Sequence, residues 1–112
     1  MGAVIVPINY RLQADDFEYI INHSGAKVVC CHPDYLPTID SIRDTLSGVQ
    51  AYVALSDPQD GWLDYEQMIA DSQPGYKPAE IAETDLISIN YTSGTTARPK
   101  GVMVTHLSLI HI

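Results

Sequence analysis

The chain carries a run of residues suited to binding an anion near its C-terminal end. Residues 89 to 106 read INYTSGTTARPKGVMVTH, with a glycine, hydroxyl side chains and two basic residues close together. Backbone N–H groups can close on phosphate oxygens only where no Cβ blocks them, and Gly94 gives that access. Lys100 offers a mobile positive charge for the outer phosphates. The hydroxyl donors are Thr92, Ser93, Thr95 and Thr96.

Charge is distributed unevenly along the chain. The formal net charge is −8, and all 14 acidic residues lie at or before Asp85. Residues 86 to 112 contain no acidic residue and carry Arg98 and Lys100. An anionic ligand would therefore prefer this end of the chain. A nucleic-acid partner is not expected, because neutralising a phosphate backbone needs a basic face that this composition can scarcely build.

The Walker phosphate loop, G-x-x-x-x-G-K-[ST], is only a partial match. Counted from Gly94, Lys100 falls at the right place, but Pro99 replaces the second glycine and Gly101 replaces the magnesium-binding hydroxyl. A Walker fold is therefore not expected. On composition alone, a Thr/Ser/Gly surface turn with one lysine remains the alternative.

Strands and helices alternate ahead of the loop. Residues 3 to 8 predict a short buried strand. A helix follows, with Phe17, Ile20, Ile21 and Ser24 spaced along one face, and Gly25 is expected to end it. The run KVVCC at 27 to 31 predicts a strand, and 35 to 46 a helix with Ile39, Ile42 and Leu46 on one side. A strand at 49 to 55 and a short helix around 62 to 72 follow.

The last predicted strand leads directly into the loop. Residues 73 to 85 read as an exposed connector, and Leu86 to Tyr91 as an apolar strand. This alternation predicts an α/β fold with a mostly parallel sheet and flanking helices. Ligands bind such sheets beyond the carboxyl ends of strands, which is where the loop begins.

Two adjacent cysteines, Cys30 and Cys31, lie in the predicted strand at 27 to 31. Neighbouring strand residues point to opposite faces, so the pair suits neither a disulfide nor a metal site. Both are predicted to be buried apolar side chains. A metal cluster with His32 is the weaker alternative.

The overall composition is that of a soluble globular protein. A chain of 112 residues permits one domain, and its hydrophobic content is 46%. No apolar run has the length needed to cross a bilayer, and MGAVIVPINYRL has no secretory-signal pattern, so a cytoplasmic location is expected. The sequence does not indicate an oligomeric state.

The loop resembles the phosphate-binding signature of a known family. YTSGTTARPKGV at 91 to 102 is similar to [YF]TSG[ST]TGxPKGV of the adenylate-forming (AMP-binding) enzymes, which include acyl-CoA synthetases, firefly luciferase and peptide-synthetase adenylation domains. GAVIVPINYRL also resembles GAVxVPINxRL, a segment that precedes the loop in these enzymes, and YIINHSGAKVV resembles the stretch that follows this segment. The wider run INYTSGTTARPKGV looks more like fatty-acyl and medium-chain acyl-CoA synthetases than like peptide-synthetase domains.

The resemblance defines an expected domain. It covers residues 2 to 106, so 1 to 106 is expected to be part of the large N-terminal AMP-binding domain, with the phosphate-binding loop at 91 to 101. The residues LSLIHI at 107 to 112 depart from the family and are interpreted as an atypical, non-native tail. Ala97 stands where the family's commonest residue is glycine, which would cost stability if φ is positive there. We interpret Ala97 as the mark of a subgroup.

The resemblance also implies an activity. Family members use ATP and magnesium to convert a carboxylic acid, here a fatty acid, to acyl-AMP, and then transfer the acyl group to CoA. Thr92, Ser93, Gly94, Thr95, Thr96 and Lys100 would hold the pyrophosphate portion of ATP. The family's catalytic residues and metal ligands match no position in this chain, which alone is expected to be inactive. The alternatives are a non-catalytic nucleotide-binding α/β module and a piece of an amino-acid adenylation domain.

Overall fold

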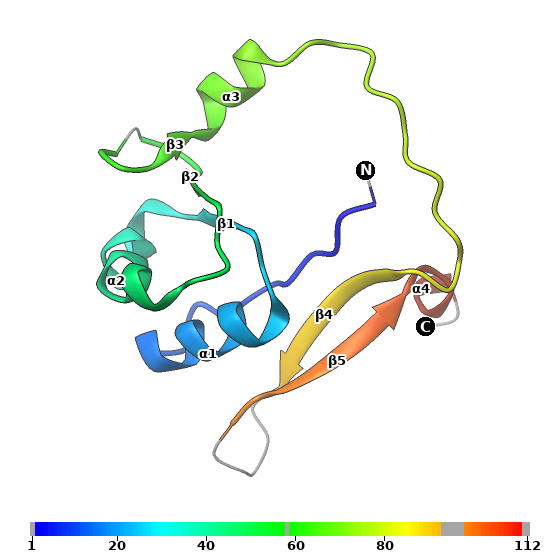
Figure 1. Ribbon diagram of the computed structural model, residues 1–112, viewed down its shortest axis with the longest axis horizontal. Coiled ribbons are helices and arrows are strands. Elements are labelled where there is room, and N and C mark those ends of the chain that lie inside the picture. The colour runs from blue at the N-terminus through cyan, green and yellow to red at the C-terminus, as the bar shows by residue number, and fades with distance from the viewer. Residues whose placement is uncertain (1, 58, 93–97, 111–112) are drawn as a thin grey trace. The chain divides into compact units, whose positions relative to one another are not determined.

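The computed structural model describes residues 2–57, 59–92 and 98–110 (Figure 1). The chain divides into two compact units. Unit 1 comprises Met1–Asn9 with Gly75–Ile112, and unit 2 comprises Tyr10–Pro74. Among the described residues, every buried hydrophobic side chain belongs to unit 2.

Unit 2 contains a three-stranded parallel sheet. Its strands β1 (Val28–Cys31), β2 (Ala51–Ala54) and β3 (Leu63–Asp64) lie in that order, and both neighbouring pairs are parallel. The predicted α/β class with a parallel sheet is therefore confirmed. The short strand β3 was not predicted, because its two residues were assigned to the helix that follows.

The helix α1 (Ala14–Ser24) precedes β1 and has the predicted buried face. The Gln13 N–H donates to the Asp16 carboxylate at 3.2 Å, which satisfies one of the donors left unpaired at a helix start. Phe17, Ile20 and Ile21 are buried, as their spacing predicted. The helix ends at Gly25, whose φ of 72° is the left-handed conformation that favours glycine.

The predicted helix at 35 to 46 is three consecutive elements: a 3₁₀ turn η1 (Pro33–Tyr35), the α-helix α2 (Leu36–Ile42) and a second 3₁₀ turn η2 (Arg43–Thr45). Pro37 lies in the first turn of α2, where a missing N–H costs nothing. The predicted apolar face is confirmed, and its buried residues are Leu36, Ile39, Ile42 and Leu46.

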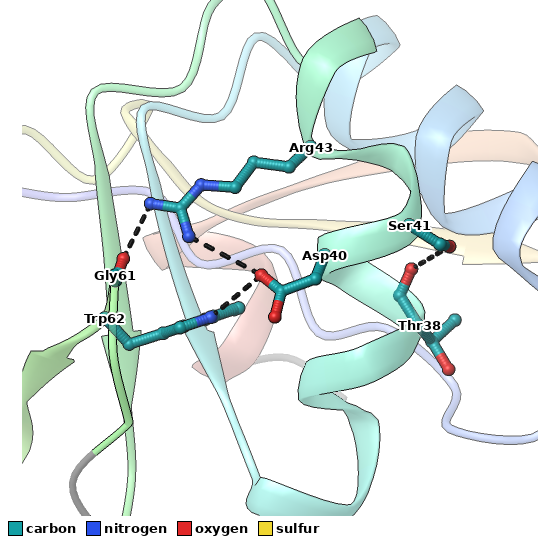
Figure 2. Close-up of polar contacts among 6 residues, drawn as sticks. All are labelled: Thr38, Asp40, Ser41, Arg43, Gly61 and Trp62. Atoms are coloured by element: carbon teal, nitrogen blue, oxygen red, sulfur yellow. Dashed lines mark hydrogen bonds and ion pairs between the residues drawn. The ribbon is translucent and has the colours of Figure 1, made fainter.

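A polar cluster joins this helical region to the sheet (Figure 2). The Trp62 indole N–H donates to the Asp40 carboxylate at 2.9 Å, and Arg43 Nη2 donates to the Gly61 carbonyl at 2.7 Å. The Arg43 guanidinium also lies 3.9 Å from the centroid of the Tyr52 ring. We call Asp40, Arg43, Tyr52, Gly61 and Trp62 the Arg43 cluster. It ties η2 to β2 and to the turn before β3.

The third helix, α3 (Tyr65–Asp71), is shorter than predicted and has no buried residue. The Asp64 carboxylate accepts from the Glu66 N–H at 3.1 Å and so caps its first turn. Trp62, which the sequence placed in this helix, lies before it and is buried. No helix in the described part of the chain is long and apolar enough to span a bilayer.

Unit 1 contains an antiparallel hairpin of β4 (Leu86–Thr92) and β5 (Lys100–Thr105), followed by α4 (His106–Ile110). The predicted connector at 73 to 85 is exposed and contains no helix or strand. The predicted buried strand at 3 to 8 is wrong: only Ile5 pairs, with Ser88 as a single parallel bridge. Val4 and Ile5 are 41% and 63% exposed, because apolar composition does not bury a strand unless other elements cover it.

Candidate functional site

The candidate phosphate-binding loop lies between the two strands of the hairpin. The predicted strand into it is confirmed, since β4 runs to Thr92. The loop residues Ser93, Gly94, Thr95, Thr96 and Ala97 lie outside the described residues. Of the predicted site residues, the structure therefore places Thr92 and Lys100.

Thr92 and Lys100 are brought together by the pairing of β4 with β5. They are register partners, and they form the pair nearest the loop. Directly opposed residues in an antiparallel ladder have their Cβ atoms about 4.5–5.5 Å apart. The hydroxyl and the ammonium group, eight positions apart in the sequence, thus start from neighbouring points on the hairpin. Both residues are exposed, so a ligand can reach them.

The sequence reasoning missed the strand on the far side of the loop. β5 returns antiparallel to β4, so the loop connects the two strands of a hairpin. A usable signal was present in KGVMVT, because valines alternate at 102 and 104 and β-branched residues favour strands. The antiparallel return matters for the site because it gives Lys100 a fixed partner in Thr92.

Lys100 is electrostatically available to an anion. In the part of the chain that the structure describes, no carboxylate forms an ion pair with it. Residues 86 to 112 contain no acidic residue that would compete within the strand pair. A phosphate would therefore be the natural counter-ion of this side chain.

The hairpin presents two different faces at the loop end. Register partners share a face, so Thr92 and Lys100 lie on the same side as Asn90 and Val102. The Ser88 hydroxyl donates to Asn90 Oδ1 at 2.7 Å, which extends the polar character of this face along β4. Tyr91 and Gly101 are also register partners and belong to the opposite face.

The sequence around the loop supplies no acidic side chain for a magnesium ion. Mg²⁺ is usually held by carboxylates together with substrate phosphates, and residues 86 to 112 supply no carboxylate. Within the described ranges there is also no group of three His, Cys, Asp or Glu residues that could hold a metal. Any carboxylate ligand of such an ion would therefore have to come from outside residues 86 to 112.

The adjacent cysteines do lie in strand β1, but only one of them is buried. Cys31 is 8% exposed, whereas Cys30 is exposed, so the prediction that both are buried is wrong for Cys30. The reason is that β1 has one exposed and one covered face at this end, and adjacent residues alternate between them.

Comparisons with known proteins give one consistent result. The family described as AMP-binding enzyme matches residues 1–112. A long-chain-fatty-acid–CoA ligase of Thermus thermophilus is 35% identical over 98% of this chain and 20% of its own length. A 4-hydroxybenzoate–CoA/benzoate–CoA ligase of Rhodopseudomonas palustris is also 35% identical, over 96% of this chain and 20% of its own.

Solved structures agree with these relatives. The anthranilate CoA ligase AuaEII in complex with anthranoyl-AMP matches with a TM-score of 0.88 and 36% identity. The match covers 94% of this chain and 20% of the length of that ligase. The N-terminal domain of FACL13 from Mycobacterium tuberculosis has a TM-score of 0.80 and 35% identity, over 94% of this chain and 25% of its own. The chain thus spans about a fifth to a quarter of the length of the proteins it matches.

Proposed function

The chain belongs to the AMP-binding enzyme family, and we propose that it is part of an ATP-dependent acyl-CoA ligase acting on a carboxylic acid. The observation that carries the proposal is the Thr92–Lys100 pair, which closes a hairpin whose loop has the family's phosphate-binding sequence. The named relatives at 35% identity are CoA ligases, which supports the reaction class.

The proposed reaction has two steps. The substrate carboxylate attacks the α-phosphorus of ATP, and the bond to the bridging oxygen breaks to give acyl-AMP and pyrophosphate. The CoA thiol then attacks the acyl carbonyl, losing its proton, and AMP leaves. The residues of this chain take part in the first step, in which positioning and charge neutralisation lower the barrier.

We assign the loop residues to the β- and γ-phosphates. Lys100 neutralises charge on the departing pyrophosphate, and Thr92 donates its hydroxyl to a phosphate oxygen from the same face of the hairpin. Ser93, Gly94, Thr95 and Thr96 supply hydroxyl and backbone N–H donors. Magnesium, when bound with ATP, would neutralise further phosphate charge, and its protein ligands would come from outside this chain.

We propose a fatty acid as the substrate and the cytoplasm as the location. Long-chain and medium-chain fatty-acid–CoA ligases are among the relatives at 35% identity, and this supports the choice. A ligase named for aromatic acids is equally similar to this chain, so aromatic acids belong in any substrate panel.

The first test is Lys100→Ala in the full-length protein. Losing a charge-assisted contact to the pyrophosphate should lower kcat/KM for ATP by roughly tenfold to a thousandfold, measured as acyl-CoA formation. The matched control is Lys77→Ala, because Lys77 is an exposed lysine in the connector at 73 to 85. It should stay close to wild type. Equal kcat/KM values in the two variants would contradict the assigned role of Lys100.

Assays of the wild-type protein distinguish the proposed function from two alternative functions. A non-catalytic nucleotide-binding module would bind ATP but show no acid-dependent exchange of pyrophosphate into ATP. An amino-acid adenylation domain would show that exchange with amino acids and no release of AMP on adding CoA. The proposed ligase should show the exchange with fatty acids and CoA-dependent release of AMP.

A further inference from the structure

Gly101 lies against the side chain of its partner across the hairpin. A Cβ built on Gly101 would be 3.2 Å from Tyr91 Cζ and 3.3 Å from Tyr91 Cε1. The same Cβ would also be 3.2 Å from Ile89 Cγ2. The Tyr91 ring therefore occupies the space beside the glycine that any other residue would need for its side chain.

This contact is tight, and two side chains of β4 make it. Each distance is shorter than ordinary van der Waals contact between carbon atoms, so an added methyl group would have to displace its neighbours. Ile89 and Tyr91 are both half-buried side chains of β4, so the methyl group would be held between a methyl group and an aromatic ring. Relief requires both side chains to shift by a few tenths of an ångström, or the two strands to move apart.

The contact is adjacent to the proposed phosphate site on both strands. Tyr91 is bonded to Thr92, Gly101 is bonded to Lys100, and the two pairs are consecutive rungs of the ladder. An aromatic side chain across from a glycine is a known way of fixing strand register, because the ring covers the exposed glycine backbone. A change in the Tyr91–Gly101 rung would therefore move Thr92 relative to Lys100.

We propose that Tyr91 and Gly101 are positioning residues for ATP. The ring of Tyr91 lies on Gly101, fixes the pairing of β4 with β5 at the base of the loop, and so sets the separation between the Thr92 hydroxyl and the Lys100 ammonium group. This inference rests on the proposed function. Neither residue needs to touch the nucleotide, since both act through the pair beside them.

The experiment is a double-mutant cycle in the full-length protein. Gly101→Ala should raise the KM for ATP by about fivefold or more, because overpacking of this size is strong enough to shift the pair. The KM for the fatty acid should stay within about twofold of wild type. In the Tyr91→Ala background the ring is absent, so the further effect of Gly101→Ala on the KM for ATP should be clearly smaller.

Three further variants complete the design. Gly48→Ala is the matched control, because its Cβ would meet only the Ala26 carbonyl oxygen at 4.0 Å and its backbone is not left-handed. It should leave both KM values unchanged. Tyr91→Phe keeps the ring and should be closer to wild type than Tyr91→Leu. If Gly101→Ala does not fold, the variants at position 91 decide the question. The KM for ATP should rise in the order Tyr91→Phe, Tyr91→Leu, Tyr91→Ala, and equal values in the three variants would overturn the positioning role.

The outcomes separate this inference from the proposed function. If the wild-type protein is active and Gly101→Ala leaves the KM for ATP unchanged, the positioning role is overturned and the proposed function is not. Equal changes in the KM for ATP and for the acid, or additive effects in the cycle, would overturn it too, because they indicate general destabilisation. Wild-type protein without ATP-dependent acyl-CoA synthesis would overturn the proposed function, and the inference with it.

Discussion

Cys30 and Cys31 show how strongly position changes the chemistry of a side chain. Cys30 is exposed, whereas Cys31 is buried and its thiol donates to the His32 carbonyl at 3.4 Å. Burial raises the pKa of Cys31 to about 11, and the negative charge of Asp40 and the neighbouring Cys30 add to the rise. Because the thiolate is the reactive form, the two adjacent thiols should differ in reactivity.

Alkylation should therefore separate the two cysteines. With iodoacetamide at pH 8, Cys30 should be modified and Cys31 should remain protected, as read by fragment-ion mass spectrometry of the peptide that contains both. In urea the two should react at similar rates, which is the control for intrinsic reactivity. Faster modification of Cys31 than of Cys30 in the folded protein would contradict the burial seen in the structure.

The same shift gives folding a pH dependence with a definite sign. The pKa of Cys31 rises from an ordinary value of 9.0 to about 11 on folding, so between these values the folded state keeps a proton that the unfolded state has lost. Its contribution to stability is fully present below pH 9 and is lost as the pH rises towards 11. A Cys31→Ala variant should lack this component of the pH dependence.

At the scale of elements, the sequence predicted best where one face of a segment determines its structure. The apolar spacing of α1 and α2 is confirmed, and Gly25 ends α1, because side-chain periodicity and backbone sterics are local properties. The strand expected at 3 to 8 failed because burial depends on which other elements cover it. The return of β5 was not predicted, because the alternating valines beyond the loop form a strand only by pairing with β4.

Around the candidate site, the strand that leads into the loop was predicted, whereas the strand pairing was not. Its position at the carboxyl end of β4 followed from a strand that runs into a glycine-containing loop. The pairing of Thr92 with Lys100, and of Tyr91 with Gly101, did not follow, because register is a property of two strands and not of either sequence alone. The Arg43 cluster was missed for a similar reason, since its members come from separate elements.

The Arg43 cluster should stabilise unit 2. Arg43→Ala would remove the stacking on Tyr52 and the hydrogen bond to the Gly61 carbonyl, and is expected to cost about 1–3 kcal/mol of unfolding free energy. The Arg43–Asp40 pair, at 3.5 Å and partly exposed, should add little because solvent screens it. The measurement is the urea midpoint of the full-length protein.

Arg43→Lys is the informative control for this cluster. Lysine keeps the charge but has no planar group to stack on Tyr52 and to reach the Gly61 carbonyl in the same geometry. It should recover only part of the lost stability. Full recovery by lysine would show that charge alone matters and that stacking does not.

At the scale of the whole molecule, the two units differ in how much they bury. Unit 2 holds all of the buried hydrophobic side chains that the structure describes, whereas in unit 1 Ile5, Val102 and Met103 are 63%, 47% and 70% exposed. A two-stranded hairpin is marginally stable in water unless something packs on it. Since relatives are about five times as long as this chain, we expect their further sequence to supply that packing.

The chain produced alone should therefore be partly ordered and inactive. Amides of α1, β1 and β2 should be protected from hydrogen exchange, because they surround the core of unit 2, while those of β4 and β5 should exchange rapidly. With the Thr92–Lys100 pair unsupported and about four fifths of the relatives' length absent, exchange of pyrophosphate into ATP should not exceed background. The full-length protein measured in parallel should be active and should protect the hairpin. Exchange activity from the 112 residues alone would show instead that the hairpin and its loop need no further sequence to position ATP.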